Sequence, residues 1–144
     1  MLDADPVNWQ PISQMPLIAG MIDGALDDTR DHVGTLNKAR ARPHVLDDAT
    51  IDRVERVHTE QLEFVDIYDR QISRWRTEKP TADQTRKLDR MEEQNRQLRV
   101  VTMEVLALLL AGKLRKGSID RIMGMSDLEI GLQALLGGRS SSRC

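Results

Sequence analysis

The chain has 144 residues, of which 40% are hydrophobic, 31% are charged and only 3% are aromatic. This length and apolar content suffice for one domain with a buried core, and they exclude a generally disordered chain. The net charge of −2 gives no global attraction to nucleic acid or to anionic membranes. Because aromatic residues are scarce, the core must be built from aliphatic side chains, which favours helices packed on helices.

Several classes of protein lack support in the sequence. The single cysteine, Cys144, can form no internal disulfide, and no cysteine–histidine cluster has the spacing of a zinc site. No serine-nucleophile motif or phosphate-binding loop is present. The N-terminus lacks the pattern of a signal peptide, and the longest apolar run, 100–112, is too short to span a membrane. We therefore expect a cytoplasmic protein without a cofactor.

The first expected element is a helix that follows an irregular lead-in at residues 1–13 and opens a single domain over 14–137. Ser13 is the expected N-cap, with Pro16 in the first turn. The helix should end before Pro43, since the residue preceding a proline is forced out of helical geometry. Its core face repeats at intervals of three and four, at Ile18, Ile22, Ala25, Thr29, Val33 and Leu36. Three glycines weaken it and allow another helix to approach closely: Gly20, Gly24 and Gly34.

The second helix is expected to begin at Asp47 or Asp48, because either carboxylate can cap its first turn. Its core face follows the same spacing, at Ile51, Val54, His58, Gln61, Val65, Tyr68, Ile72 and Trp75. Two adjacent positions of this face, His58 and Gln61, are polar. The apolar pattern is therefore interrupted at the middle of the helix.

A turn at residues 78–80 leads into a third helix, for which Thr81 and Gln84 have capping-box spacing. Gly117 is its expected end, since glycine often follows the last helical turn. Its core face is expected at Leu88, Met91, Asn95, Leu98, Thr102, Val105 and Leu109. The sequence thus predicts an all-α, up-down helical bundle built on a long antiparallel helix hairpin. The expected C-terminal features are short helices starting at Ser118 and Ser126 and a flexible tail at 138–144.

His58 belongs to a spacing with catalytic associations. Arg53 and His58 form R-x-x-x-x-H, which resembles the motif of HEPN-type ribonucleases, helical bundles of about this size. The resemblance implies that the arginine and the histidine act together on the phosphodiester of RNA. With three permitted spacings between the arginine and the histidine, a match is also expected about once by chance in a chain with this many arginines.

Two further interpretations of His58 compete with that one. Glu55 and His58 form E-x-x-H. Aligning the helices about their turns brings Glu104, together with Asp28, Asp31 or His32, to the same level, which would give a metal-binding bundle with Glu55, His58, Glu104 and His32 as the candidate ligands. In the structural interpretation, which we favour, His58 lies opposite Thr102 in a polar core layer with Gln61 one layer away. Such a layer costs stability and fixes the register of the helices.

Charge is distributed unevenly along the chain. Residues 1–31 hold six aspartates against one arginine, whereas residues 70–90 hold seven basic against three acidic residues. A basic hairpin tip with an aromatic ring is compatible with nucleic-acid contact. The residues of that alternative are Arg70, Arg74, Trp75 and Arg86. Since the whole surface is not basic, we expect no tight nucleic-acid binding.

The stretch 101–112 is apolar nearly all round a helix, so more than one of its sides must be covered. The second helix can cover one side, whereas Met103, Leu106 and Leu110 point elsewhere. Monomers rarely expose a contiguous apolar face, and closed two-fold dimers are the commonest oligomers. The leading interpretation is therefore a non-enzymatic helical interaction or scaffold protein that forms a homodimer, and a different protein partner is also compatible.

Overall fold

The computed structural model describes residues 8–40 and 47–123, with side chains as far as Lys113. The chain divides into two compact units, Met1–Leu109 and Leu110–Cys144, and the bundle described below belongs to the first. Among the described residues, no helix combines the length and apolar character needed to cross a membrane.

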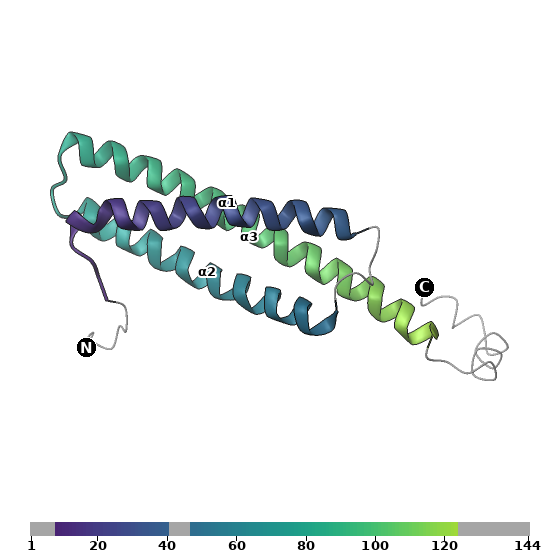
Figure 1. Cartoon of the computed structure of the whole chain (residues 1–144). Coiled ribbons are helices and arrows are strands. Elements are labelled where there is room, and N and C mark those ends of the chain that lie inside the picture. The colour runs from purple at the N-terminus through teal and green to yellow at the C-terminus, as the bar shows by residue number, and fades with distance from the viewer. Residues whose placement is uncertain (1–7, 41–46, 124–144) are drawn as a thin grey trace, which may run out of the picture. The chain divides into compact units, whose positions relative to one another are not determined.

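Three α-helices follow a short 3-10 turn, η2, at Ile12–Gln14 (Figure 1). They are α1 over Met15–Ala39, α2 over Asp48–Arg76 and α3 over Ala82–Met123. The turn after Arg76 reverses the chain, so α2 and the first part of α3 form an antiparallel hairpin against which α1 packs (Figure 1). The prediction of an all-α bundle on a helix hairpin is confirmed.

Local capping explains where the helices of the hairpin begin. The Asp47 carboxylate accepts a 2.7 Å hydrogen bond from the Thr50 backbone N–H. Thr81 and Gln84 form the predicted capping box, with reciprocal bonds of 2.9 and 3.1 Å. The predicted cap at Ser13 is wrong: η2 precedes α1, and the N-cap is Gln14, whose side chain makes no capping hydrogen bond.

The residues of the predicted core faces are buried or partly buried in the structure, but the core is not continuous. A larger cluster at the hairpin end includes Ile22, Val65, Trp75, Leu88 and Leu98. A smaller cluster lies toward the other end of the bundle and is formed by Leu36, Ile51, Val105 and Leu109. The buried polar residues Thr29, His58 and Thr102 belong to neither cluster.

The predicted end of the third helix at Gly117 is wrong, because α3 continues to Met123. One glycine costs a helix about 1 kcal/mol, and Lys113 to Lys116, just before it, have high helix propensity. The short C-terminal helix expected from Ser126 and the tail at 138–144 lie outside the described residues. A separate helix starting at Ser118 is replaced by the continuation of α3.

The α1 glycines do not mark a close helix contact within the described chain. A Cβ atom added at Gly20, Gly24 or Gly34 would meet no heavy atom within 4 Å. Among residues 8–40 and 47–113, no other helix approaches these glycines closely, so the expected close approach is not found there. Their remaining effect is to lower the helix propensity of α1.

Replacing Gly34 with alanine is expected to raise the free energy of unfolding by about 1 kcal/mol, because alanine is the better helix former and open space surrounds the position. Urea denaturation followed by circular dichroism measures the change, and the exposed neighbour Thr35→Ala provides a control of smaller effect. A clear loss of stability in Gly34→Ala would show that an unseen contact uses this surface.

Candidate functional site: a polar layer between the helices

A polar layer crosses the bundle where α1, α2 and α3 face one another, and Gln61 lies at its centre. The Gln61 amide nitrogen donates 2.8 Å hydrogen bonds to both Thr29 Oγ1 and Thr102 Oγ1. Each threonine hydroxyl in turn donates a 2.6 Å bond to the backbone carbonyl four residues earlier in its own helix. One side chain of α2 therefore links α1 and α3 through two threonine hydroxyls. The residues that carry them, Thr29 and Thr102, are 1% and 0% exposed.

A pair of histidines extends this layer between α1 and α2. His32 Nδ1 and His58 Nε2 are 3.0 Å apart, with the two rings in an edge-on arrangement. His58 is buried and His32 is exposed. The other ring nitrogen of His58, Nδ1, lies 2.7 Å from the carbonyl oxygen of Val54. The buried imidazole thus has a partner at both nitrogens.

These contacts restrict where the protons lie. Because the Val54 carbonyl can only accept, His58 Nδ1 must carry a proton, and a neutral His58 must accept at Nε2 from His32 Nδ1–H. If His58 gains a second proton, His32 has to become the acceptor and must itself be neutral. The pair can therefore hold one extra proton, whereas a second would break the hydrogen bond and place two positive charges side by side.

Burial lowers the pKa of His58 below its ordinary value of 6.5. The hydrogen bond to the Val54 carbonyl opposes this shift, and the neighbouring His32 adds to it. The neutral imidazole is thus the favoured form in the folded protein at neutral pH. It packs as a polar core residue with both nitrogens satisfied.

A second buried polar residue of α3, Asn95, lies nearer the hairpin turn than the polar layer does. Its amide nitrogen donates to the Val65 carbonyl at 2.9 Å and to Asp69 at 2.7 Å. Asp69 also receives a 2.8 Å hydrogen bond from Arg99, which pairs with Asp66 as well. Asn95 thereby ties α3 directly to the backbone of α2.

The polar-layer prediction named His58, Gln61 and Thr102, which do take part, but it was wrong about one pairing and did not include Thr29 or His32. His58 bonds to His32, not to Thr102, and Thr102 bonds to Gln61. The reason is the rotation between successive layers: His58 and Gln61 occupy adjacent turns of α2 and point toward different neighbours. The alignment of the helices about their turns did place His32 at the level of His58.

Of the proposed metal ligands, the structure brings only His32 and His58 together. Glu104 is exposed on α3, and Glu55 is partly buried on α2. Within residues 8–40 and 47–113, no group of three or more histidine, cysteine, aspartate or glutamate side chains is arranged to hold a metal ion. The four-residue set of the metal interpretation is therefore not assembled.

The HEPN-like pair is not assembled within the chain either. Arg53 is exposed, whereas His58 is 2% exposed and bonded at both ring nitrogens. Residues five apart on an α-helix lie about 140° apart around its axis, so the two side chains point to different sides of α2. In the described structure, the imidazole of this pair is thus already occupied by His32 and by the Val54 carbonyl.

The aromatic residue of the nucleic-acid alternative is not accessible for stacking. Trp75 is 0% exposed, and its indole N–H donates a 2.9 Å hydrogen bond to the Gln10 carbonyl. Arg70 and Arg74 instead stack over Trp9, 5.0 and 4.7 Å from its ring centroid. Arg86 is exposed and pairs with Asp83 in its own helix. The sequence did not predict that Trp9 would contact these arginines, because its only sign of such a role was its aromatic ring.

The three residues of the predicted self-association face differ in their exposure. Met103 and Leu110 are each 56% exposed. Leu106 is partly buried and packs against the smaller core cluster. An exposed face on α3 therefore omits Leu106.

Replacing His58 with leucine is expected to preserve the fold and to remove a pH dependence of stability. The pKa of His58 is lowered in the folded state, so the unfolded chain binds more protons just below pH 6.5. The free energy of unfolding consequently falls as the pH drops through 6.5, by up to about 1.4 kcal/mol per pH unit. Urea denaturation across this range should show the loss in the wild type and in His32→Leu, but much less in His58→Leu.

Equal pH slopes in the wild type and His58→Leu would contradict the buried, neutral imidazole. Elemental analysis of the purified protein is the companion measurement. A near-stoichiometric transition metal that disappears in both histidine variants would make the pair a metal site rather than a core contact.

Comparisons with protein-family models, with curated proteins and with solved structures found no match to this chain.

Proposed function

We propose that the protein is a non-enzymatic helical interaction protein that associates with a second copy of itself through the outer side of α3. The observation that carries the proposal is the exposure of large apolar side chains on this side. Val100 is 55% exposed and Met103 is 56% exposed, although the core faces of the same helix are closed. Leaving such side chains in water is unfavourable unless a partner covers them.

The spacing of these residues supports a helix as the partner. Val100, Met103 and Ala107 are separated by three and four residues and are all exposed. This is the spacing at which one helix packs along another in a coiled-coil contact. In the sequence, Leu110 continues the same spacing and is also exposed.

The polar layer favours a structural role over catalysis. His58 and the two threonines are buried and Gln61 is partly buried, and all four are hydrogen-bonded to one another, to His32 or to the backbone. A catalytic group needs access to substrate and an unoccupied donor or acceptor. The arrangement instead supports a rigid scaffold whose outer surface makes the functional contact.

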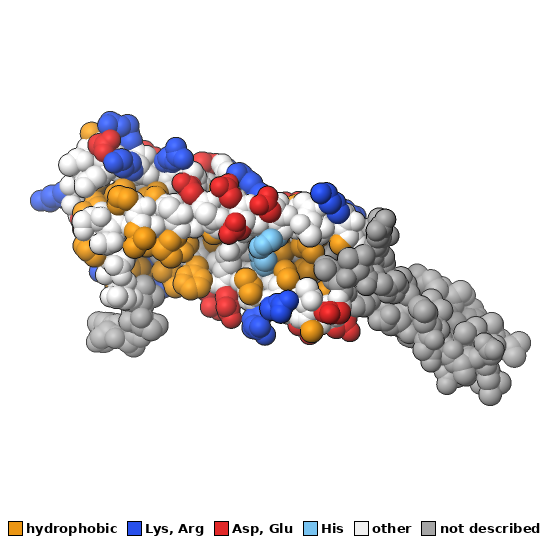
Figure 2. Space-filling view, viewed as in Figure 1, with side chains coloured by type: hydrophobic (Ala, Val, Ile, Leu, Met, Phe, Trp, Pro, Cys, Tyr) orange, Lys and Arg blue, Asp and Glu red, His pale blue; other side chains and the backbone are white. Residues whose placement is uncertain are grey.

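A second apolar surface lies along the line where α1 meets α2. Figure 2 shows hydrophobic side chains gathered along this line, with charged groups on both sides of them. Its exposed members are Leu17 and Met21 on α1 and Val57 and Phe64 on α2. The apolar residues of α3 follow the three–four spacing of a helix–helix seam, which favours α3 as the contact surface. The α1–α2 surface supplies the comparison.

Sedimentation velocity over a range of concentrations tests this proposal. The wild type is expected to form a dimer, and the double variant Met103→Asp, Leu110→Asp to remain monomeric with its helix content unchanged, because both positions are exposed. Each buried carboxylate would cost the interface several kcal/mol. Phe64→Asp, at a position 52% exposed on the other surface, should dimerise like the wild type.

Two results would contradict the proposal. A wild type that stays monomeric at high concentration would remove self-association altogether. Dissociation by Phe64→Asp, without an effect of the α3 double variant, would move the contact to the α1–α2 surface and reject the α3 face.

A further inference from the structure

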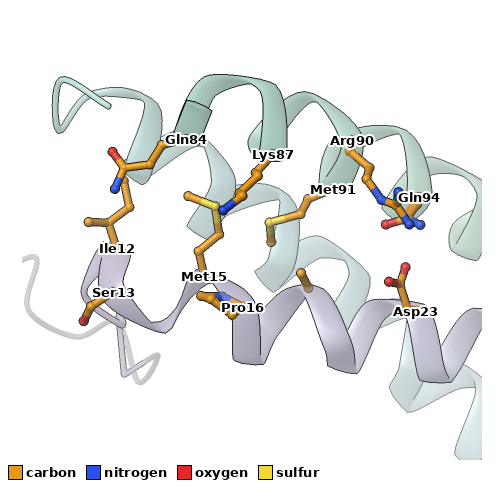
Figure 3. Close-up of a pocket in the computed structure, with 11 residues that line it drawn as sticks. Ile12, Ser13, Met15, Pro16, Asp23, Gln84, Lys87, Arg90, Met91 and Gln94 are labelled. Carbon is orange, nitrogen blue, oxygen red and sulfur yellow. The ribbon is translucent and has the colours of Figure 1, made fainter. Parts of the chain in front are cut away.

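A groove of about 490 Å³ lies between the start of α1 and the first turns of α3 (Figure 3). The first unit contains the whole groove, and it shares no residue with the polar layer. Its volume falls within the range of sites that hold small organic molecules, about 300 to 1,000 Å³. The chemistry of its walls therefore indicates what kind of molecule it can hold.

The floor of the groove is apolar and rich in sulfur. Met15 from α1 and Met91 from α3 extend into it from facing helices (Figure 3), and Ala19 also lines it. Both methionines are almost wholly buried, at 4% and 2% exposed. Methionine side chains adapt to the shape of a guest, and their sulfur atoms make favourable contacts with aromatic rings.

One end of the groove carries opposite charges on its two walls. Asp23 from α1 and Arg90 and Gln94 from α3 extend toward this end (Figure 3). Asp23 Oδ1 is buried and has no hydrogen-bond partner among the described residues. A buried carboxylate oxygen without a donor is costly, so a donor is expected to occupy the space in front of it.

The cationic wall is available as well. Arg90 is exposed, and it makes no ion pair or hydrogen bond within the part of the chain that the structure describes. Lys87, nearer the middle of the groove, is already paired with Asp83 at 3.0 Å. The end of the groove therefore offers one carboxylate and one guanidinium that lack partners, beside an apolar floor.

We infer that this groove binds a zwitterionic α-amino acid with an apolar, preferably aromatic, side chain. The ligand's ammonium group donates to Asp23, its carboxylate accepts from Arg90, and its side chain lies against Met15 and Met91. Each component of the ligand thus meets a group of matching chemistry. The inference does not depend on self-association, because none of the residues involved belongs to the α3 outer face.

Ligands with a single charge fit less well. A simple carboxylate would pair with Arg90 but leave Asp23 unsatisfied and repelled by the new negative charge. A simple amine would satisfy Asp23 but face the uncompensated guanidinium. A neutral hydrophobe would use only the floor and would displace water from both charged groups without replacing its hydrogen bonds.

The probe is L-phenylalanine, titrated into the full-length protein labelled with ¹³C at the methionine methyl groups. Saturable shifts are expected at the Met15 and Met91 methyls, with a Kd of about 1 mM or tighter for a ligand of this size. The exposed methyls of Met21 and Met103 serve as internal controls and should not move. N-acetyl-L-phenylalanine lacks the ammonium group and phenethylamine lacks the carboxylate, so each should bind about tenfold more weakly.

Matched variants assign the charged contacts. Asp23→Asn and Arg90→Gln should each weaken phenylalanine binding by about tenfold. The methionine methyl spectra of both variants without ligand should stay dispersed, as expected of a folded protein. Arg86→Gln removes an exposed cation of the same helix outside the groove and should have no effect. The inference is overturned if phenylalanine gives no saturable shift up to about 10 mM, or if the singly charged analogues bind equally well.

Discussion

The structure depends most on the contact of Gln61 with two threonines on different helices. One amide group has two N–H donors, and here each donor bonds to a hydroxyl of a neighbouring helix. Sliding any one helix along its axis by a single turn would leave at least one of these buried groups without a partner. Since such a loss costs about 1–3 kcal/mol per group, the layer selects one register from several that the apolar side chains alone would permit.

This register determines what the protein presents to its surroundings. Two hydrophobic clusters close the core, while the turns of α3 opposite to them present Val100 and Met103 outward. The same register aligns the start of α1 with the first turns of α3, which brings Asp23 and Arg90 to one groove. The self-association and the ligand binding that we propose would both follow from a scaffold whose enclosed polar groups are structural.

Much of this fold was predictable because it follows from short-range rules. Three–four periodicity predicted the buried faces of the helices, and the sequences around Asp47 and Thr81 predicted how α2 and α3 begin. The errors arose at features that depend on how the helices pack in three dimensions or on how several helix preferences add up. Pairing His58 with Thr102 ignored the rotation between layers, and ending α3 at Gly117 gave one weak helix former too much weight. The groove at Asp23 had no signal in the sequence, since its walls come from segments some 60 residues apart.

The most direct test of the central claim is an amide NMR spectrum of a variant in which the polar layer is made apolar. In Thr29→Val, Gln61→Leu, Thr102→Val, the three hydrogen-bonded polar side chains are replaced together, so no unpaired partner remains among them. The account predicts unchanged or greater stability together with broadened or multiple amide resonances, because apolar contacts no longer distinguish one register from the next. A single set of sharp resonances, with wild-type shifts away from the substituted layer, would contradict the claim that this layer fixes the register.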